Sequence, residues 1–345
     1  MKIARALGWG VLGITALVIL LALTLAAFGF DVPASIQVIA KGAFGSKYGI
    51  ANTLVRSCPL ILCGLGIAVA WRGGMFNIGG EGQYLVGAVA GAYLYKVLGS
   101  SPSIIFQIAS LLVGAAAGGL LAGFAAWLQI RRGVQVVIST ILLNFIVLQF
   151  IEWSVRGPAQ EKARALPLSD QLPRSMMLGR FDPQTDLHAG VLLLPLVAAV
   201  VFIWLLRSHA GLRLRLVGEN PRAARANNIP IDRVQFRAMA VSGALCGLAG
   251  SVDYLGWIGN VGSGSAQNWG FLAIPVALLG SLNPVGILAS GVCFGGLLAG
   301  CEALARSNSA GSTVVYVVQA AAVLGYVGIS MWLKSRKPDF SEESA

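Results

Sequence analysis

The sequence predicts an all-α protein, a polytopic bundle of about ten transmembrane helices, and three features indicate this class. Hydrophobic residues make up 56% of the 345 residues and charged residues only 11%, whereas soluble domains carry roughly 25% charged residues. Apolar runs close to the roughly 20 residues that cross a bilayer recur from Leu7 to Leu333. The 44 glycines suit membrane helices, which pack closely through small residues.

Ten apolar stretches are candidate spans. In chain order they are 7–28, 50–70, 81–98, 102–130, 134–151, 189–206, 236–257, 269–282, 285–305 and 312–333. The first is too long for the apolar core of a secretory signal, and no clear cleavage site follows it, so a retained span is predicted. The stretch 269–282 is too short to cross alone, which predicts a half-helix or a continuation of the preceding loop.

Charges between the spans predict the orientation of the bundle. Residues 207–237 contain seven arginines against two acidic residues, and Arg131 and Arg132 separate two spans. The loop 152–187 balances its basic residues with acidic ones. Basic loops stay in the cytoplasm. The arginine-rich segments are therefore predicted to be cytoplasmic, and so are both termini, which agrees with an even number of spans.

Composition also argues against two kinds of partner. The net charge of +11 does not indicate nucleic-acid binding, because the basic residues lie between apolar runs, where the positive-inside rule expects them. The five cysteines lie in apolar stretches without a CxxC pair, and the only histidines are His188 and His209. Metal sites need clustered ligands, so none is predicted.

The longest predicted outward segment is the loop 152–187, which contains four prolines. Proline removes backbone donors and blocks long helices. A compact cap on the outer face is expected. Two roles stay open for it: a docking site for a binding protein, or a simple connector.

Two glycine-rich stretches interrupt the helical pattern: the first break, residues 72–83, and the second break, residues 259–269. Each joins the first two spans of a four-span block, 50–151 and 236–333. In the predicted topology the first break lies toward the cytoplasm and the second toward the outside. Interrupted helices at matching positions of inverted repeats mark transport sites. The chain 1–345 is therefore predicted to be one transmembrane domain built from an inverted repeat.

Polar and aromatic side chains at the two breaks are the candidate substrate pathway. They are Phe76, Asn77, Glu81 and Gln83 in the first break and Asn268 and Trp269 in the second. The amide and carboxyl groups can hydrogen-bond hydroxyls or base edges, an aromatic ring can stack on a base, and the glycines let a ligand approach the backbone. An alternative stays open, in which Asn77 and Glu81 cap the next helix and hold the repeat shut.

The driving force is predicted to come from a partner or from a gradient of the solute. Secondary transporters place acids or histidines within their spans, and the candidates here, Glu81, Asp253 and Glu302, each lie near a span end. No GxxxxGK[ST] phosphate loop is present, so the chain does not bind ATP by that route. An intramembrane enzyme would need a metal cluster or a His–carboxylate constellation, which the sequence lacks.

The basic segment, residues 207–235, is where a partner would act. Asn220 is a good N-cap, Pro221 suits the first helical position, and an alanine-rich stretch follows. Asn227 or Asn228 can end this short helix in a left-handed conformation. So short a helix is marginal alone and needs something to pack on. The alternative is a positive-inside loop with an incidental turn.

This segment resembles the cytoplasmic coupling loop of ABC importer permeases of the branched-chain amino acid, ribose and nucleoside superfamily. That loop typically reads close to GENPEAARYAGI, and residues 218–229 read GENPRAARANNI. Asn228 stands where the family has glycine, and Ala226 where it has tyrosine. The resemblance implies that the ATPase is contacted through Gly218, Glu219, Asn220, Pro221, Ala223, Ala224, Arg225 and Asn228.

A second resemblance involves the first break. Residues 59–83 are similar to the signature of the larger permease of nucleoside importers that use a basic-membrane-protein-type lipoprotein. The usual form FNIGAEGQ appears here as FNIGGEGQ, with Gly80 in place of alanine. Sugar permeases of the superfamily carry a GGIDLS-like sequence at this place, which this chain lacks. The resemblance covers roughly residues 50–333.

The two resemblances imply a multi-pass permease of a bacterial cytoplasmic (inner) membrane. Its implied partners are an ABC ATPase subunit, a related second permease in a heterodimer, and an extracytoplasmic substrate-binding protein. ATP and Mg would be bound by the ATPase, and this chain would carry no cofactor and no catalytic site. The implied function is nucleoside or purine-like solute import, with a permease for a simple sugar and an ion-coupled secondary carrier as the alternatives.

The residues themselves also favour a neutral, planar solute with hydroxyl groups. A zwitterionic amino acid would need a partner for each charge in low-dielectric surroundings, because uncompensated burial is costly. Half-helix N-termini can satisfy a carboxylate, so amino acids are disfavoured without being excluded.

Overall fold

The computed structural model describes residues 29–99 and 101–307, together with the single positions 19, 22, 23, 26, 317 and 320. The chain divides into two compact units, residues 1–53 with 296–345 and residues 54–295. All regular structure in the described residues is helical, apart from isolated β-bridges. The predicted spans 7–28 and 312–333, and with them the predicted positions of the termini, lie outside the described ranges.

In the first unit the main described element is α2 (Val32–Phe44). Asp31 caps this helix, since its carboxylate accepts a hydrogen bond from the Ala34 amide at 3.2 Å. Ile39 on α2 packs against Cys301 and Leu304, near the end of α12 (Pro284–Ser307). The sequence prediction did not include α2, because 13 residues are too few to cross a bilayer and the spans were chosen by length.

The second unit contains the remaining helices. In chain order they are α3 (Lys47–Arg72, which begins in the first unit), α4 (Gly80–Leu98), α5 (Ser103–Arg132), α6 (Val136–Val155), α7 (Leu193–Arg207), α8 (His209–Glu219), α9 (Pro221–Ala226), α10 (Ile231–Asp253), α11 (Trp269–Leu279) and the first part of α12. Short turns η1 (Arg174–Met176) and η2 (Ala189–Leu192) and a π-helical turn, η3 (Tyr254–Ile258), complete it.

Six helices in the described part are long and apolar enough to cross a membrane. They are 47–72, 103–132, 136–155, 189–207, 231–258 and 284–307. The predicted stretch 81–98 is also a helix, α4, whereas 269–282 forms only the 11-residue α11, as expected for a half-helix. The all-helical class is therefore confirmed for the described residues, and the six long apolar helices agree with a multi-pass membrane protein. The count of ten spans stays a prediction.

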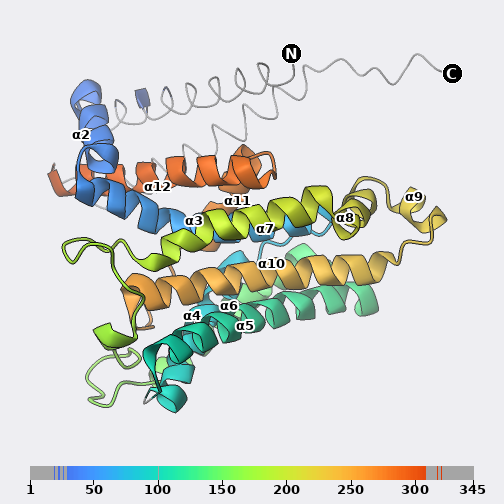
Figure 1. The fold of residues 1–345 in the computed structure, drawn as a ribbon, viewed down its shortest axis with the longest axis horizontal. Coiled ribbons are helices and arrows are strands. Elements are labelled where there is room, and N and C mark those ends of the chain that lie inside the picture. The colour runs from blue at the N-terminus through green and yellow to red at the C-terminus, as the bar shows by residue number, and fades with distance from the viewer. Residues whose placement is uncertain are drawn as a thin grey trace. The chain divides into compact units, whose positions relative to one another are not determined.

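Helices α4, α5 and α10 pack through glycines, and Figure 1 shows α5 and α10 side by side. A side chain at Gly87 of α4 or Gly114 of α5 would overlap α10, at Gly247 and Ser251 respectively. The Ser251 hydroxyl donates to the Gly87 carbonyl at 3.2 Å and to the Ser110 carbonyl at 3.1 Å. Small residues thus let three backbones approach and bond, which is how membrane helices associate.

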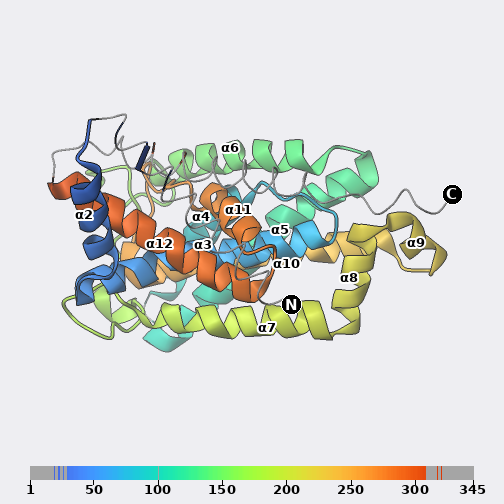
Figure 2. The same ribbon diagram turned by 90° about the horizontal axis from the view of Figure 1, so that it is seen from above.

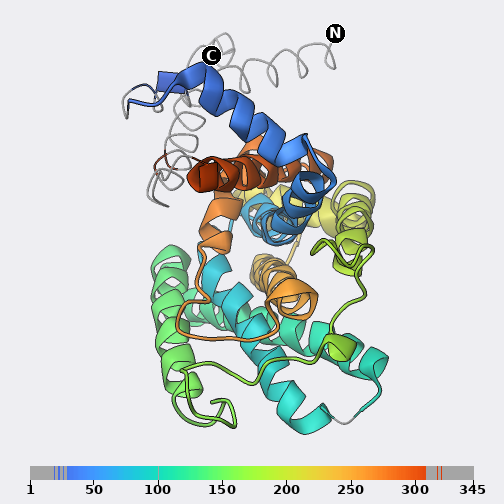
Figure 3. The same ribbon diagram turned by 90° about the vertical axis from the view of Figure 1, so that its left-hand side faces the viewer.

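A loop covers one end of this unit. Residues 156–188 cross over the helix ends together with the second break, as Figure 3 shows. The Ser169 amide donates to the Val261 carbonyl at 2.7 Å, and the Leu172 amide donates to the Gly259 carbonyl at 2.8 Å. The loop is therefore bonded to the second break, and its predicted place on the outer face stays a prediction.

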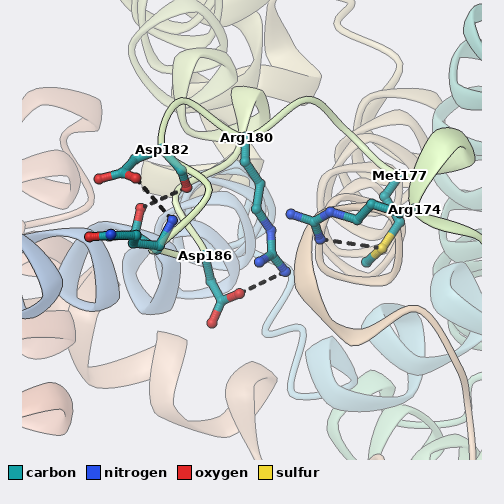
Figure 4. Close-up of polar contacts among 7 residues, drawn as sticks. Arg174, Met177, Arg180, Asp182 and Asp186 are labelled. Carbon is teal, nitrogen blue, oxygen red and sulfur yellow. Dashed lines mark hydrogen bonds and ion pairs between the residues drawn. The ribbon is translucent and has the colours of Figure 1, made fainter.

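Charged residues stiffen the same loop (Figure 4). Arg180 forms an ion pair with Asp186 at 2.7 Å, and the Asp182 carboxylate accepts from the Gln184 amide at 2.9 Å. His188, at the end of the loop, is fully buried and its Nδ1 accepts from the Gly190 amide at 3.2 Å. Burial, and then the nearby Arg180 guanidinium, lower the pKa of His188 to about 4. The imidazole is therefore neutral at neutral pH.

At the opposite end α8 turns away from the direction of α7, and α9 lies beyond it (Figure 2). Ser208 caps α8, because its hydroxyl accepts from the Gly211 amide at 3.0 Å. The sequence prediction placed one short helix in the basic segment, and the structure adds α8, an 11-residue helix. Two arginines alternate with its leucines, and its buried face is small, consisting of Gly211, Leu214 and Val217.

Candidate functional site

The first break leaves the helical path, and neighbouring side chains bond to several of its backbone groups. Gly74, at φ 76°, turns the chain at the end of α3, a conformation that suits glycine. The side chain of Asn144 on α6 then accepts from the Gly82 amide at 2.8 Å and donates to the Ile78 carbonyl at 3.1 Å. The indole of Trp71 donates to the Asn77 carbonyl at 3.3 Å. Irregular backbone at membrane depth is tolerated only when it is satisfied in this way.

Asn77 and Gln83 form a reciprocal amide pair inside the fold. The Asn77 amide nitrogen donates to Gln83 Oε1 at 2.8 Å, and Gln83 Nε2 donates to Asn77 Oδ1 at 3.0 Å. Asn77 also donates to the Ser242 hydroxyl of α10 at 2.9 Å and accepts from the Gly79 amide at 2.9 Å. Both side chains are buried. Their polar atoms therefore hold the break together.

Glu81 joins the two breaks. One carboxylate oxygen accepts from the Asn268 amide at 3.0 Å, and the other accepts from the Gly270 amide at 2.7 Å. These amides belong to the N-cap and the first turn of α11, where a negative charge is favourable. One alternative from the sequence was that Glu81 caps the next helix, α4. That target was wrong, since the carboxylate caps a helix almost 190 residues further along the chain.

The far end of α11 is held by the other end of the first break. Arg72, the last residue of α3, donates from Nε to the Leu282 carbonyl at 2.8 Å. Leu282 lies in the turn that follows α11, at φ 54°. An acidic group at the start of α11 and a basic group near its end both complement the helix dipole. The first break thus clamps α11 at both ends.

Glycines allow this close approach. Gly80 faces Gly270, and a Cβ on Gly80 would lie 3.4 Å from the Gly270 Cα. A Cβ on Gly270 would overlap the Gly80 carbonyl carbon and the Glu81 amide nitrogen. Backbone atoms cannot rotate away as a flexible side chain can. The capping bonds of Glu81 therefore require glycine at position 270.

The other predicted pathway residues have different surroundings. Phe76 is 51% exposed and meets Trp71 edge to face, with ring centroids 5.3 Å apart. Asn268 is exposed and left-handed, at φ 61°. Trp269 is buried, and its indole nitrogen has no hydrogen-bond partner among the described residues. Of the six candidates, only Phe76 and Asn268 present side chains at the surface of the described chain.

The sequence indicated Asp253 as an acid near a span end, but it did not indicate the partner of this carboxylate. Asp253, at the end of α10, is fully buried, and one carboxylate oxygen accepts from the Tyr84 hydroxyl at 2.8 Å. Tyr84 follows Gln83 in the first turn of α4. Ser242 and Tyr84 were both missed, because a lone serine or tyrosine in an apolar helix carries no sequence signal for its partner.

The short helix of the basic segment forms as predicted. α9 begins after Asn220, whose side chain accepts from the Ala223 amide at 3.0 Å. Asn228 follows at φ 56°, the left-handed position that the family fills with glycine. Ala224 is buried, while Pro221 and Arg225 are exposed. This end therefore presents a stiff, basic, capped turn.

The basic segment touches the first break directly. A side chain at Gly218, near the end of α8, would overlap the Arg72 carbonyl, and a Cβ on Gly74 would lie 3.4 Å from the Gly218 Cα. A side chain at Gly73 would press on Leu214 of α8. A displacement of α8 and α9 therefore reaches the residues that clamp α11. The arrangement forms a continuous contact path from the exposed α9 to α11.

Comparison with known proteins agrees with this architecture. Residues 49–327 match the family described as "Branched-chain amino acid transport system / permease component". This match includes both breaks, the basic segment and every helix from α4 to α12.

Individual relatives are ABC transporter permeases. The chain is 33% identical to the guanosine ABC transporter permease protein NupP of Bacillus subtilis, over 88% of each chain. It is 27% identical to the nucleoside ABC transporter permease protein NupB of Lactococcus lactis, over 92% of this chain and 89% of the relative. It is also 30% identical to the glucose ABC transporter permease protein TsgB13 of Haloferax volcanii, over 81% of this chain and 76% of the relative.

Proposed function

This chain belongs to the branched-chain amino acid transport permease family of ABC transporters, and on that premise we propose that it imports a nucleoside or purine-like solute. The ATPase would be a partner subunit, which binds ATP and Mg. A related second permease and an extracytoplasmic binding protein complete the proposed importer. Its place is a bacterial cytoplasmic membrane, with the basic segment and both termini on the cytoplasmic side, as the arginine distribution favours.

The observation that carries the proposal is the contact of Gly218 with Arg72 and Gly74. An importer driven by a partner must convey the partner's movement into its transmembrane helices. α9 is capped and exposed, so it is suited to receive such a movement. α8 is packed on the first break, so it is suited to pass the movement on.

We assign the buried residues of the first break to this transmission. Asn77, Glu81 and Gln83 form their hydrogen bonds with other groups of the protein. A rigid break moves α11 as one body, because both ends of α11 are bonded to it. Solute contact in the proposed pathway falls instead to exposed groups such as Phe76 and Asn268.

Two arguments favour a nucleoside as the solute. The FNIG-EGQ sequence of the first break is similar to the signature of nucleoside permeases. Two of the relatives described above are named as guanosine or nucleoside permeases. The relative named for glucose gives a sugar specific support as the second candidate. An ion-coupled carrier has weaker support, since both oxygens of Glu81 are bonded to backbone amides.

The test of this function is uptake in cells that lack this permease, compared with cells that carry it. Labelled guanosine uptake is expected to fall on deletion, to depend on ATP and to resist a protonophore. Loss of glucose uptake with intact nucleoside uptake would show that the substrate is a sugar. Uptake that follows the proton gradient and ignores ATP depletion would contradict the importer assignment.

A single substitution tests the partner contact. Ala224→Trp places a large ring at the buried side of α9, and it is expected to abolish uptake and to weaken co-purification of the ATPase, with the permease still inserted. Arg132→Trp is the matched control, since Arg132 is an exposed residue at a helix end outside the basic segment. Normal uptake with a tightly bound ATPase in Ala224→Trp would refute the coupling role of α9.

A further inference from the structure

A groove lies where the end of α5 meets the start of α10. Its lining residues are Trp127, Ile130, Arg131, Asp232, Arg233, Phe236 and Arg237, and its volume is about 230 Å³, several times the roughly 30 Å³ of a water molecule. Both helices are candidate membrane spans. The groove therefore lies at the level where a span leaves the bilayer.

Its charge is strongly unbalanced. Three arginines line it against a single acid, Asp232. None of the three arginines has an ion-pair partner within residues 29–99 and 101–307. Arg233 and Arg237 also lie in the first two turns of α10, where the helix dipole disfavours a cation. An anion bound here would compensate all three guanidinium groups.

An exposed apolar stripe leads to this basic end along one face of α5. Leu120 is 75% exposed, Phe124 48% and Trp127 42%, and Arg131 follows them. The spacing of four, three and four residues keeps all of them on one face of a helix. Phe124 and Trp127 stack with their ring centroids 5.9 Å apart. The stripe changes from aliphatic to aromatic to basic toward the helix end. Membrane spans show the same order of side chains from the hydrocarbon core to the interface and the cytoplasmic side.

Phe236 completes the wall on α10. Its ring lies over Gly123 of α5, where a Cβ would be 3.4 Å from the ring edge. A glycine at this position leaves room for an aromatic residue beside the arginines.

We propose that the α5/α10 groove binds one anionic phospholipid, whose acyl chain follows the α5 stripe and whose phosphate lies among Arg131, Arg233 and Arg237. Basic pockets between helices bind anionic headgroups by this combination of charge and apolar wall. A free inorganic anion would use the arginines and leave the stripe unused. The inference rests on the membrane location of α5 and α10 and is independent of the solute that the permease carries.

The experiment measures lipid binding to the full-length chain by native mass spectrometry in neutral detergent. Phosphatidylglycerol, phosphatidylcholine and inorganic phosphate are titrated separately. Phosphatidylglycerol is expected to bind far more tightly than phosphatidylcholine, and R131Q and R233Q are each expected to weaken it about fivefold. R131K keeps the charge and is expected to stay within about twofold of wild type.

Arg132 supplies the matched control, because it is exposed beside Arg131 and does not line the groove. R132Q is expected to leave phosphatidylglycerol binding unchanged. Equal binding of the two lipids, or equal effects of R131Q and R132Q, would overturn the proposal. Full displacement of phosphatidylglycerol by millimolar inorganic phosphate would overturn it in favour of a free anion. Displacement by the ATPase subunit, with loss of ATPase binding in R233Q, would overturn it in favour of a protein contact.

Discussion

The two breaks are both rich in glycine, but their structures differ. In the first, Asn77, Glu81 and Gln83 are buried and bonded, and the break is tied to α6, α10 and α11. In the second, residues 263, 264 and 266–268 are exposed, and the backbone pairs with the loop 156–188. A glycine-rich interruption therefore has two structural uses in one chain: a buried clamp on α11 and an exposed segment that pairs with a loop.

Packing explains this difference. Polar groups within an apolar bundle must find partners, because an unsatisfied buried group costs about 1–3 kcal/mol. The first break lies among helices and meets that demand with side chains from its neighbours. The second break is bonded to the loop 156–188 over its first residues, its middle is exposed, and only the Asn268 amide at its end bonds to Glu81. The comparison predicts that substitutions in the first break are costly and that matched substitutions in the second are mild.

The largest effect is expected from Gly270→Ala, which forces a Cβ into the backbone of Gly80 and Glu81. Overpacking against backbone is expected to cost about 3 kcal/mol of stability and to abolish uptake. Gly264→Ala is the control in the second break, since no atom lies within 4 Å of a Cβ there. Thermal unfolding and uptake measure both variants. Equal stability and uptake of the two variants would contradict the role of the clamp.

A smaller difference is expected between two asparagines. Asn77→Ala leaves Gln83, Ser242 and the Gly79 amide without a partner, which is expected to cost about 2 kcal/mol of folding free energy. Asn260 donates to Gln171 at an exposed position, at 2.8 Å. Asn260→Ala is therefore expected to cost less than about 0.5 kcal/mol. Unfolding of the two variants in mixed micelles gives the comparison, and a larger loss for Asn260→Ala would reverse it.

Glu81→Gln sharpens the role of the clamp. Glutamine offers one acceptor oxygen for two backbone amides, so one capping bond of α11 is lost. The expected cost is about 1.5 kcal/mol and slower uptake, without a new dependence of uptake on pH. Glu302→Gln, which alters a partly exposed ion pair with Arg306, is expected to cost less than about 1 kcal/mol. A shifted pH profile in Glu81→Gln would point to proton coupling instead.

The smallest expected effect is a loss of folding stability at acidic pH. The pKa of His188 is lowered to about 4, from an unfolded value of about 6.5. The unfolded chain then binds more protons between these values, so stability falls as the pH falls. A loss of about 1 kcal/mol is expected between pH 7 and 5.5. His188 packs against Gly256, beside the second break. His188→Gln should flatten this dependence, and an unchanged slope would assign the acid sensitivity elsewhere.

Much of this fold follows from the sequence, and its limits have a physical cause. Apolar length located α3, α4, α5, α6, α7, α10 and α12, and capping chemistry located α9 between Asn220 and Asn228. α2 was missed because it is short, and α8 because it is also short and its leucines alternate with arginines. These features depend on local sequence or on length alone.

The contacts that define the clamp could not be predicted in the same way. Glu81 was singled out, but its partners lie almost 190 residues away, and the bond from Arg72 to Leu282 joins residues 210 positions apart. Spacing along the chain says nothing about such pairs. The glycine motif gave the location of the first break, and only the folded chain gave its partners.

The most direct test of the account follows the amides that Glu81 caps. Hydrogen exchange of the peptide around residues 265–275 would be measured in the assembled transporter, with and without ATP, for wild type and Gly218→Val. This variant disrupts the contact of α8 with Arg72 and changes no residue of α9 or of its N-cap Asn220. If movement passes through the first break, ATP is expected to change this exchange in wild type and to leave it unchanged in Gly218→Val with the ATPase still bound. The same change in both proteins would contradict transmission through the first break.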